Sequence, residues 1–295
     1  MTTTTTYARP GNLGEALHLL AQPGARPLGG GTDLAGQLDR GLTTAATIVD
    51  LQALGLDAIS ATGAGVRIGG TVTLADVAES DVLSPWTVVR EAASAAASPI
   101  LRNQGTVGGN LCQHTRCWYY RGLEWNCWLG GGDTCYAQIG EHRKHNLQPG
   151  DCISAHPSDL APALLACRAT VHLQSAYGER ELELADLYRR PTEQDRSLID
   201  LAVGEIVTAV ELTEAPDASV YLRLGERRAF SFPLVSVAVA RFGNEVVVAA
   251  GGVATIPLLL DPADPLADLP GNPESAWKRI VVATLVARGL EATRA

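Results

Sequence analysis

The sequence has 295 residues, of which 46% are hydrophobic, and a formal net charge of -9. That length and apolar content suffice for a buried core divided among two or three subdomains. The acidic balance, without a run of Lys or Arg, argues against nucleic acid or an anionic membrane as a partner.

The first predicted element is a helix over residues 12–22. Its apolar residues Leu13, Leu17 and Leu20 fall on one face, and the Pro23-Gly24 pair ends it. A short apolar strand and the glycine-rich turn Gly29-Gly-Gly31 follow, before a second helix over 34–40. Adjacent glycines let a backbone approach phosphate oxygens closely. The spacing fits neither G-x-G-x-x-G nor a P-loop, so an ordinary tight turn is the alternative to a nucleotide site.

The rest of the chain predicts a mixture of helices and strands. Strands are expected at 48–51 and 66–68, and helices at 74–79, 86–97 and 160–167. The later predictions are a hairpin of 170–175 with 181–185, strands at 205–212, 221–224, 234–242 and 246–250, and a helix at 276–290. The pattern pauses at 213–216, which indicates a boundary before a C-terminal α+β module.

Most of the candidate chemistry lies between Gly105 and Asp159. The stretch begins with a second glycine turn, Gly105-Thr-Val-Gly-Gly-Asn110, and holds five of the six cysteines. A loop this rich in Gly and polar residues buries little apolar surface, so a bound metal would supply the missing ordering free energy. The absence of a C-x-x-C pair disfavours a zinc ribbon, and four thiolates on an irregular loop suit an iron-sulfur cluster better.

Other interpretations of the cysteines stay open from spacing alone. They could be free and partly buried, as is expected for Cys167 on its helix. A mixed site could include a histidine from the group His114, His142, His145 and His156. Cys112, next to the second glycine turn, could replace one of the four later cysteines.

Five motifs stand in the chain in the order Gly29-Gly-Gly-Thr-Asp-Leu34, Ile100-Leu-Arg-Asn103, Gly105-Thr-Val-Gly-Gly-Asn-Leu111, His156-Pro-Ser-Asp159 and Arg227-Arg-Ala-Phe230. Together they resemble the FAD-binding medium subunits of the xanthine dehydrogenase family of molybdenum hydroxylases. The resemblance implies an α+β fold of the vanillyl-alcohol-oxidase (PCMH) type. It further implies FAD-binding subdomains at 1–56 and 57–214, with an iron-sulfur loop at 112–152 in the second, and a C-terminal domain at 215–295.

The resemblance also implies which residues contact FAD. They lie in the two glycine turns, in the His-Pro-Ser-Asp motif and on two later strands, and comprise Pro27, Leu28, Gly29, Gly30, Gly31, Thr32, Asp33, Leu34, Thr106, Gly108, Gly109, Asn110, Ser158, Asp159, Ile206 and Arg223. Arg223 stands where many relatives have Lys, and a planar guanidinium does not reproduce the contacts of a compact ammonium.

The cysteine segment resembles an insertion found in two subgroups of this family. They are the flavin subunits of bacterial aldehyde oxidoreductase and of 4-hydroxybenzoyl-CoA reductase, in which the insertion binds a 4Fe-4S cluster. The implied ligands are Cys117, Cys127, Cys135 and Cys152, with Cys112 and Cys167 not involved.

The function implied is electron transfer rather than chemistry on the organic substrate, so no catalytic residue is expected in this chain. FAD would pass electrons between 2Fe-2S clusters and an external acceptor. The implied partners are a 2Fe-2S subunit and a molybdopterin-binding large subunit, in a heterotrimer or a dimer of heterotrimers that oxidises an aldehyde, an aromatic compound or a heterocycle.

Alternative functions are a reductase subunit acting on an aromatic acyl-CoA, a stand-alone flavin oxidase and a zinc-stabilised scaffold. The N-terminal Thr run lacks the segments of a signal peptide, and no apolar run is long enough to cross a membrane. A cytoplasmic location is therefore expected, with export alongside a partner subunit as the alternative.

Overall fold

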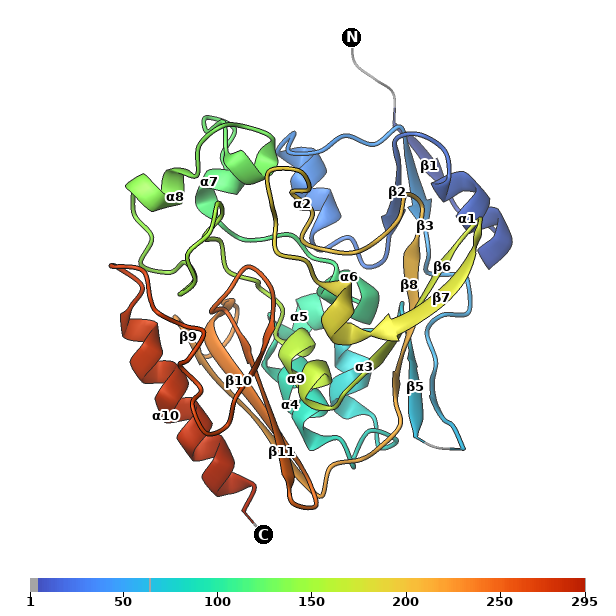
Figure 1. Cartoon of the computed structure of the whole chain (residues 1–295). Coiled ribbons are helices and arrows are strands. Elements are labelled where there is room, and N and C mark those ends of the chain that lie inside the picture. Colours follow the sequence, from blue (N-terminus) through green and yellow to red (C-terminus); the bar gives the residue numbers. More distant parts are fainter. Residues whose placement is uncertain (1–4, 64, 295) are drawn as a thin grey trace.

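The computed structural model describes residues 5–63 and 65–294, and its strands form three sheets (Figure 1). The first sheet is parallel, with the order β1-β3-β2, and comprises β1 (Thr6–Ala8), β2 (Ala25–Leu28) and β3 (Thr47–Asp50). Helix α1 (Leu13–Leu20) connects β1 to β2. It begins one residue after the predicted start, because Asn12 is the residue that caps it, its side chain accepting a hydrogen bond from the Glu15 amide at 2.9 Å. Helix α2 (Leu34–Asp39) follows the first glycine turn.

The second sheet is antiparallel, with the order β4-β5-β8-β6-β7. Its strands are β4 (Ile59–Ala61), β5 (Val66–Gly69), β6 (Thr170–Ser175), β7 (Gly178–Glu183) and β8 (Ile206–Leu212). The predicted hairpin is confirmed as β6 and β7. Strand β7 begins three residues before the expected position, because Ser175 pairs with Gly178 and leaves only two residues in the turn.

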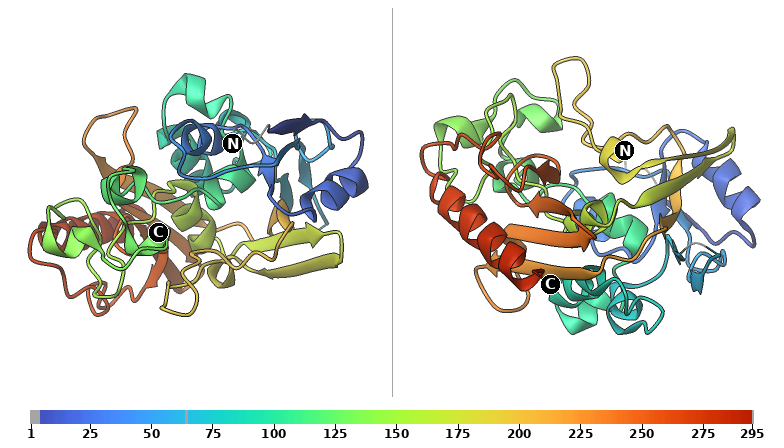
Figure 2. Two further views of the ribbon diagram at one scale, coloured as in Figure 1. Left: turned by 90° about the horizontal axis from the view of Figure 1, so that it is seen from above. Right: turned by 60° about the horizontal axis from the view of Figure 1, so that its bottom comes forward.

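The third sheet, ordered β12-β11-β10-β9, has helices on both faces (Figure 2). It comprises β9 (Ala218–Gly225), β10 (Pro233–Phe242), β11 (Glu245–Gly251) and β12 (Leu258–Leu260). Along β10, Val237 and Val239 pack in one core with Val282 and Val286 of α10 (Trp277–Ala292). Alternate residues such as Ala238 belong to another core on the opposite face. This period of two is what a strand covered on both faces requires.

The larger core joins the second and third sheets. Its longer helices are α3 (Leu74–Glu79), α4 (Thr87–Ala95) and α9 (Leu160–Ala166), which lie between the sheets in Figure 1. The remaining elements are one-turn or two-turn helices: α5 (Pro99–Arg102), α6 (Val107–Leu111), α7 (Trp118–Arg121), η1 (Trp128–Gly130), α8 (Tyr136–Ile139) and η2 (Leu184–Leu187). Three of them, α7, η1 and α8, are all the helical structure described within residues 112–152.

The three sheets fall within the ranges predicted as subdomains, 1–56, 57–214 and 215–295, although the division itself stays a prediction. Among residues 5–63 and 65–294, no helix combines the length and apolar character of a membrane span.

Candidate functional site

A pocket of about 430 Å³ lies where the two glycine turns, the cysteine segment and the third sheet meet, and it is called the main pocket here because predicted cofactor contacts line it. Its volume is in the range of small-molecule and cofactor sites. Residues predicted as cofactor contacts that line it are Thr32, Asp33, Thr106, Gly109, Asn110 and Asp159. Further lining residues include Arg116, Cys117, Trp118, Lys144, His145, His156, Arg227, Phe230 and Phe232.

The two glycine turns pack directly against each other. A Cβ atom on Gly30 would lie 1.4 Å from the carbonyl oxygen of Gln104, and one on Gly29 would lie 2.6 Å from Thr106 Oγ1. Gly31 has a φ of +71°, which residues with a side chain rarely adopt. From the sequence, the absence of a Cβ atom at these glycines was expected to leave room for phosphate oxygens. At Gly30 that room is occupied by the Gln104 carbonyl of the chain itself. These glycines therefore place Thr32 and Asp33 at the wall of the main pocket.

The second glycine turn is held by its own side chains. Thr106 Oγ1 caps α6 by accepting from the Gly109 amide at 3.2 Å. A Cβ on Gly108 would lie 3.0 Å from the Gly70 carbonyl oxygen, so this residue serves packing against the second sheet. The Ser158 hydroxyl donates to Asn110 Oδ1 at 2.5 Å. Two predicted contacts, Asn110 and Ser158, are thereby joined although distant in sequence.

Asp159 lies buried at the end of the main pocket nearest the third sheet. It accepts a hydrogen bond from the Tyr221 hydroxyl at 2.7 Å and pairs with Arg223 Nε at 3.2 Å. Burial raises the pKa of Asp159 to about 6, against the opposing effects of Arg223 and Tyr221. Arg223 also donates to the Ser231 carbonyl at 2.6 Å, so it supports the pocket wall from behind rather than lining it.

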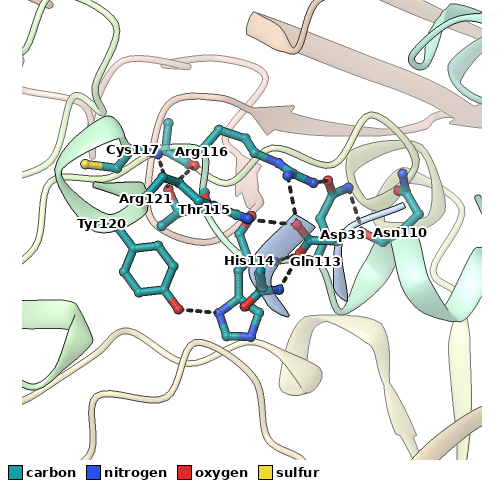
Figure 3. Close-up of polar contacts among 11 residues, drawn as sticks. Asp33, Asn110, Gln113, His114, Thr115, Arg116, Cys117, Tyr120 and Arg121 are labelled. Carbon is teal, nitrogen blue, oxygen red and sulfur yellow. Dashed lines mark hydrogen bonds and ion pairs between the residues drawn. The ribbon is translucent and has the colours of Figure 1, made fainter. Parts of the chain in front are cut away.

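Asp33 connects the first glycine turn to the cysteine segment (Figure 3). Its carboxylate pairs with Arg116 at 2.8 Å and Arg121 at 2.9 Å, and it accepts the His114 amide at 2.9 Å. Burial acts to raise the pKa of Asp33, but the two guanidinium groups together with the amide outweigh it and leave the pKa below its usual value. The carboxylate stays ionised and fixes the two segments to each other.

The other predicted contacts lie outside the lining of the main pocket. Pro27 and Leu28 are part of β2, and Leu34 begins α2. Ile206 is buried in the core of the first sheet, with Leu17 and other apolar residues. Because Ile206 belongs to β8 of the second sheet, its side chain packs the second sheet against the first.

The structure adds two polar residues that were not assigned as cofactor contacts. His156 is buried and lines the main pocket, and its Nε2 atom has no hydrogen-bond partner among the described residues. Arg116 also lines the pocket, and its buried Nε atom likewise lacks a described partner. Burial lowers the pKa of His156 to about 3, which keeps its ring neutral. Buried polar atoms are normally paired, so these two fit a polar ligand bound in the pocket.

Both residues were within motifs that the sequence analysis quoted. His156 opens the His-Pro-Ser-Asp motif, and Arg116 immediately precedes the first proposed cysteine ligand. The exposed aromatic residues Phe230 and Phe232 complete the pocket rim, and the Arg116 guanidinium lies 4.5 Å from the centre of the Phe232 ring.

A separate, small cavity is lined by four cysteines and is called the four-cysteine cavity here. The chain brings together Cys117, Cys127, Cys135 and Cys152, the four implied as ligands. Three of them immediately precede the short helices α7, η1 and α8. Cys167 is instead buried in the large core, and Cys112 packs against that core. Burial raises the pKa of each of these two thiols to about 12.

The surroundings lower the pKa of one of the four thiols, Cys135, and raise the pKa of the other three. Burial raises the pKa of Cys117 to about 11, while the amides of Tyr119 and Tyr120 oppose that effect. A hydrogen bond from Cys152 lowers the pKa of Cys135 to about 6 and raises that of Cys152. Four sulfur atoms with nearby amide donors are a donor set that fits an iron-sulfur cluster. Within the described parts of the chain, no group of three or more His, Cys, Asp or Glu is arranged to hold a metal ion as it stands.

The histidines of the cysteine segment have separate surroundings. His114 Nδ1 is 2.9 Å from the Tyr120 hydroxyl, and His142 Nδ1 is 3.0 Å from the Gly140 carbonyl. His145 is buried with Nε2 3.2 Å from Cys117 Sγ. Of these three histidines, His145 is therefore the one that contacts one of the four sulfurs.

Comparison with known proteins identifies relatives along most of the chain. Residues 3–214 match the family described as the FAD binding domain in molybdopterin dehydrogenase. The chain is 36% identical over 269 residues to the aldehyde oxidoreductase FAD-binding subunit of Escherichia coli, a match covering 88% of this chain and 84% of that protein. It is 27% identical over 255 residues to the glyceraldehyde dehydrogenase medium chain of Sulfolobus acidocaldarius, covering 84% and 75%.

Solved structures share the fold over nearly the full length. Reconstituted CO dehydrogenase from Oligotropha carboxidovorans superposes with a TM-score of 0.73 at 21% identity, covering 99% of this chain and 98% of that chain. Quinoline 2-oxidoreductase from Pseudomonas putida gives a TM-score of 0.68 at 19% identity, covering 98% and 96%. These matches confirm the predicted fold class.

Proposed function

Because the chain belongs to the family of FAD-binding domains in molybdopterin dehydrogenases, we propose that it is the FAD-binding, electron-transferring subunit of a molybdenum hydroxylase complex. The observation that carries this proposal is the main pocket, which gathers both glycine turns and the His-Pro-Ser-Asp motif around one cavity. Bound FAD would supply redox chemistry that joins one-electron carriers to a two-electron acceptor.

The chain's own residues would bind and orient the cofactor. Thr32, Thr106 and Asn110 offer polar groups at the pocket wall, and the unpartnered nitrogens of Arg116 and His156 offer further hydrogen-bonding positions. Asp33 holds Arg116 by an ion pair, so the guanidinium is fixed before the ligand binds. The aromatic rim would limit the access of water to the bound ring system.

The four-cysteine cavity supports a second cofactor. We propose that Cys117, Cys127, Cys135 and Cys152 hold a 4Fe-4S cluster, because their four sulfurs line one cavity and Cys112 and Cys167 lie elsewhere. The donor set consists of thiols alone, which suits iron-sulfur ligation. Since thiols must lose protons to bind metal, cluster binding would overcome the raised pKa values of Cys117, Cys127 and Cys152.

Other chains of the complex would bind and oxidise its substrate. We propose partners that carry 2Fe-2S clusters and a molybdopterin, and an aldehyde as the substrate of the assembled complex. The support is the 36% identity to an aldehyde oxidoreductase FAD-binding subunit.

The test uses anaerobic addition of an aromatic aldehyde to the assembled complex and to the isolated chain. Loss of the flavin absorption bands in the complex, with no change in the isolated chain, is the expected result. Aldehyde-dependent bleaching of the isolated chain would contradict the assignment, because a subunit that only transfers electrons cannot oxidise the aldehyde alone.

A further inference from the structure

One of the four cysteines also belongs to the main pocket. Cys117 lines both cavities, whereas the other three line only the four-cysteine cavity among the residues that the structure describes. Its neighbours Arg116 and Trp118 line the main pocket as well. Cys117 is therefore a direct covalent link between the walls of the two cavities.

His145 reinforces this link. Its Nε2 atom lies 3.2 Å from Cys117 Sγ, its side chain lines the main pocket, and it is 2% exposed. Its ring and that of Trp118 are in edge-to-face contact, with ring centroids 4.7 Å apart. Nδ1 has no hydrogen-bond partner in the part of the chain described. Nε2 is therefore the ring nitrogen that has a partner in the protein, and that partner is the Cys117 sulfur.

The C-terminal helix holds His145 in place. Lys278 of α10, which is 0% exposed, donates from Nζ to the Lys144 carbonyl at 2.8 Å and to the Gly252 carbonyl at 2.8 Å. The Ser275 hydroxyl donates to the Asn146 carbonyl at 2.7 Å. The backbone is thus anchored on both sides of His145, while packing against Trp118 holds the imidazole ring beside Cys117.

We propose that His145 is a positioning residue that donates its Nε2 hydrogen to the Cys117 sulfur and thereby sets how electrons are shared between the four-cysteine cavity and the main pocket. The inference rests on the proposed cluster and flavin. In each electron transfer, one electron would leave the cluster and enter the flavin, or the reverse, and no bond in the chain forms or breaks. Cys117 lines both cavities and so lies on the path of this electron transfer.

A hydrogen bond to a ligand sulfur stabilises the reduced cluster, which carries more negative charge. Its removal should therefore lower the reduction potential of the cluster and leave more of the electrons on the flavin. The full free energy of one hydrogen bond to a charged group corresponds to a change of roughly tenfold to more than a hundredfold in the ratio of reduced cluster to reduced flavin.

The experiment is an anaerobic redox titration of the full chain, followed by visible and EPR spectra, after iron and FAD contents have been measured. His145→Leu removes the donor, and His145→Gln keeps an N–H group of similar reach. His142→Leu is the matched control, because His142 is in the same segment and contacts the Gly140 carbonyl and the Glu274 amide. We expect a lower cluster potential in His145→Leu only, with recovery in His145→Gln.

An unchanged potential in His145→Leu would overturn the inference while leaving the cluster assignment intact. Wild-type protein without iron would overturn the cluster assignment itself, and the inference with it. If His145→Leu loses its cluster, pulsed EPR of the reduced wild-type protein with 15N-labelled histidine decides the question. A magnetic coupling to a histidine nitrogen supports the hydrogen bond, and its absence refutes it.

Discussion

Replacing Gly30 by Ala should separate the two glycine turns and weaken FAD binding. The added Cβ would lie 1.4 Å from the Gln104 carbonyl oxygen, so the backbones must move apart by about 2 Å to reach ordinary contact. Overpacking of this kind costs about 1–3 kcal/mol of folding free energy. Each charge-assisted contact to FAD that the shift breaks adds about 1.5–3 kcal/mol to the loss of binding, a weakening of roughly tenfold to more than a hundredfold.

The assay is the FAD-to-protein ratio after purification, followed by a fluorescence titration of the apoprotein with FAD. Gly69→Ala is a crowding control, since its Cβ would lie 2.0 Å from the Leu56 carbonyl oxygen but Gly69 does not line the main pocket. Gly36→Ala is the neutral control, with no atom within 4 Å of the new Cβ. Equal FAD affinity in the Gly30 and Gly69 variants would refute the reasoning, because the Gly30 effect would then be general destabilisation.

Three further predictions concern the cysteines and two buried charges. Cys127→Ser should lose iron and sulfide, whereas Cys167→Ser should retain both; equal iron contents would contradict the ligand assignment. Asp33→Asn should lower the free energy of unfolding by about 1–3 kcal/mol, because it leaves two arginines without their carboxylate, and urea denaturation measures the loss. Burial lowers the pKa of Lys278 to about 7, so between that value and about 10 the unfolded state binds the extra proton. As the pH rises through that interval, the free energy of unfolding of the wild type should therefore increase relative to that of Lys278→Met by about 1.4 kcal/mol per pH unit. Parallel plots of unfolding free energy against pH for the two proteins would show that the lysine pKa is not depressed.

Local sequence patterns predicted the longer elements well. Helix α3 was expected at 74–79 and has those bounds, because its apolar spacing and the Thr73 cap act within one or two turns. The helices α5 to α8 were not predicted, since each has five residues or fewer and shows no helical period. Strand β12 was also missed, because its three residues follow a loop and gain their order by pairing with β11.

The site could be predicted only in part, because segments far apart in sequence build it. Resemblance selected both glycine turns, but the contact between Gly30 and Gln104 depends on how the first and second subdomains pack. Ile206 shows the same dependence, since its side chain lies in the core of the first sheet. The pairing of Asp33 with Arg116 joins two loops that no local pattern connects. Electrostatic and packing partners of this kind appear only in the folded chain.

The most direct test of the central claim is the visible spectrum of the purified full chain, combined with its FAD, iron and acid-labile sulfide contents. The account predicts flavin bands with a broad iron-sulfur shoulder, one FAD per chain, and four iron and four sulfide atoms per chain. Flavin bands without iron, or zinc in place of iron, would contradict the proposed combination of cofactors.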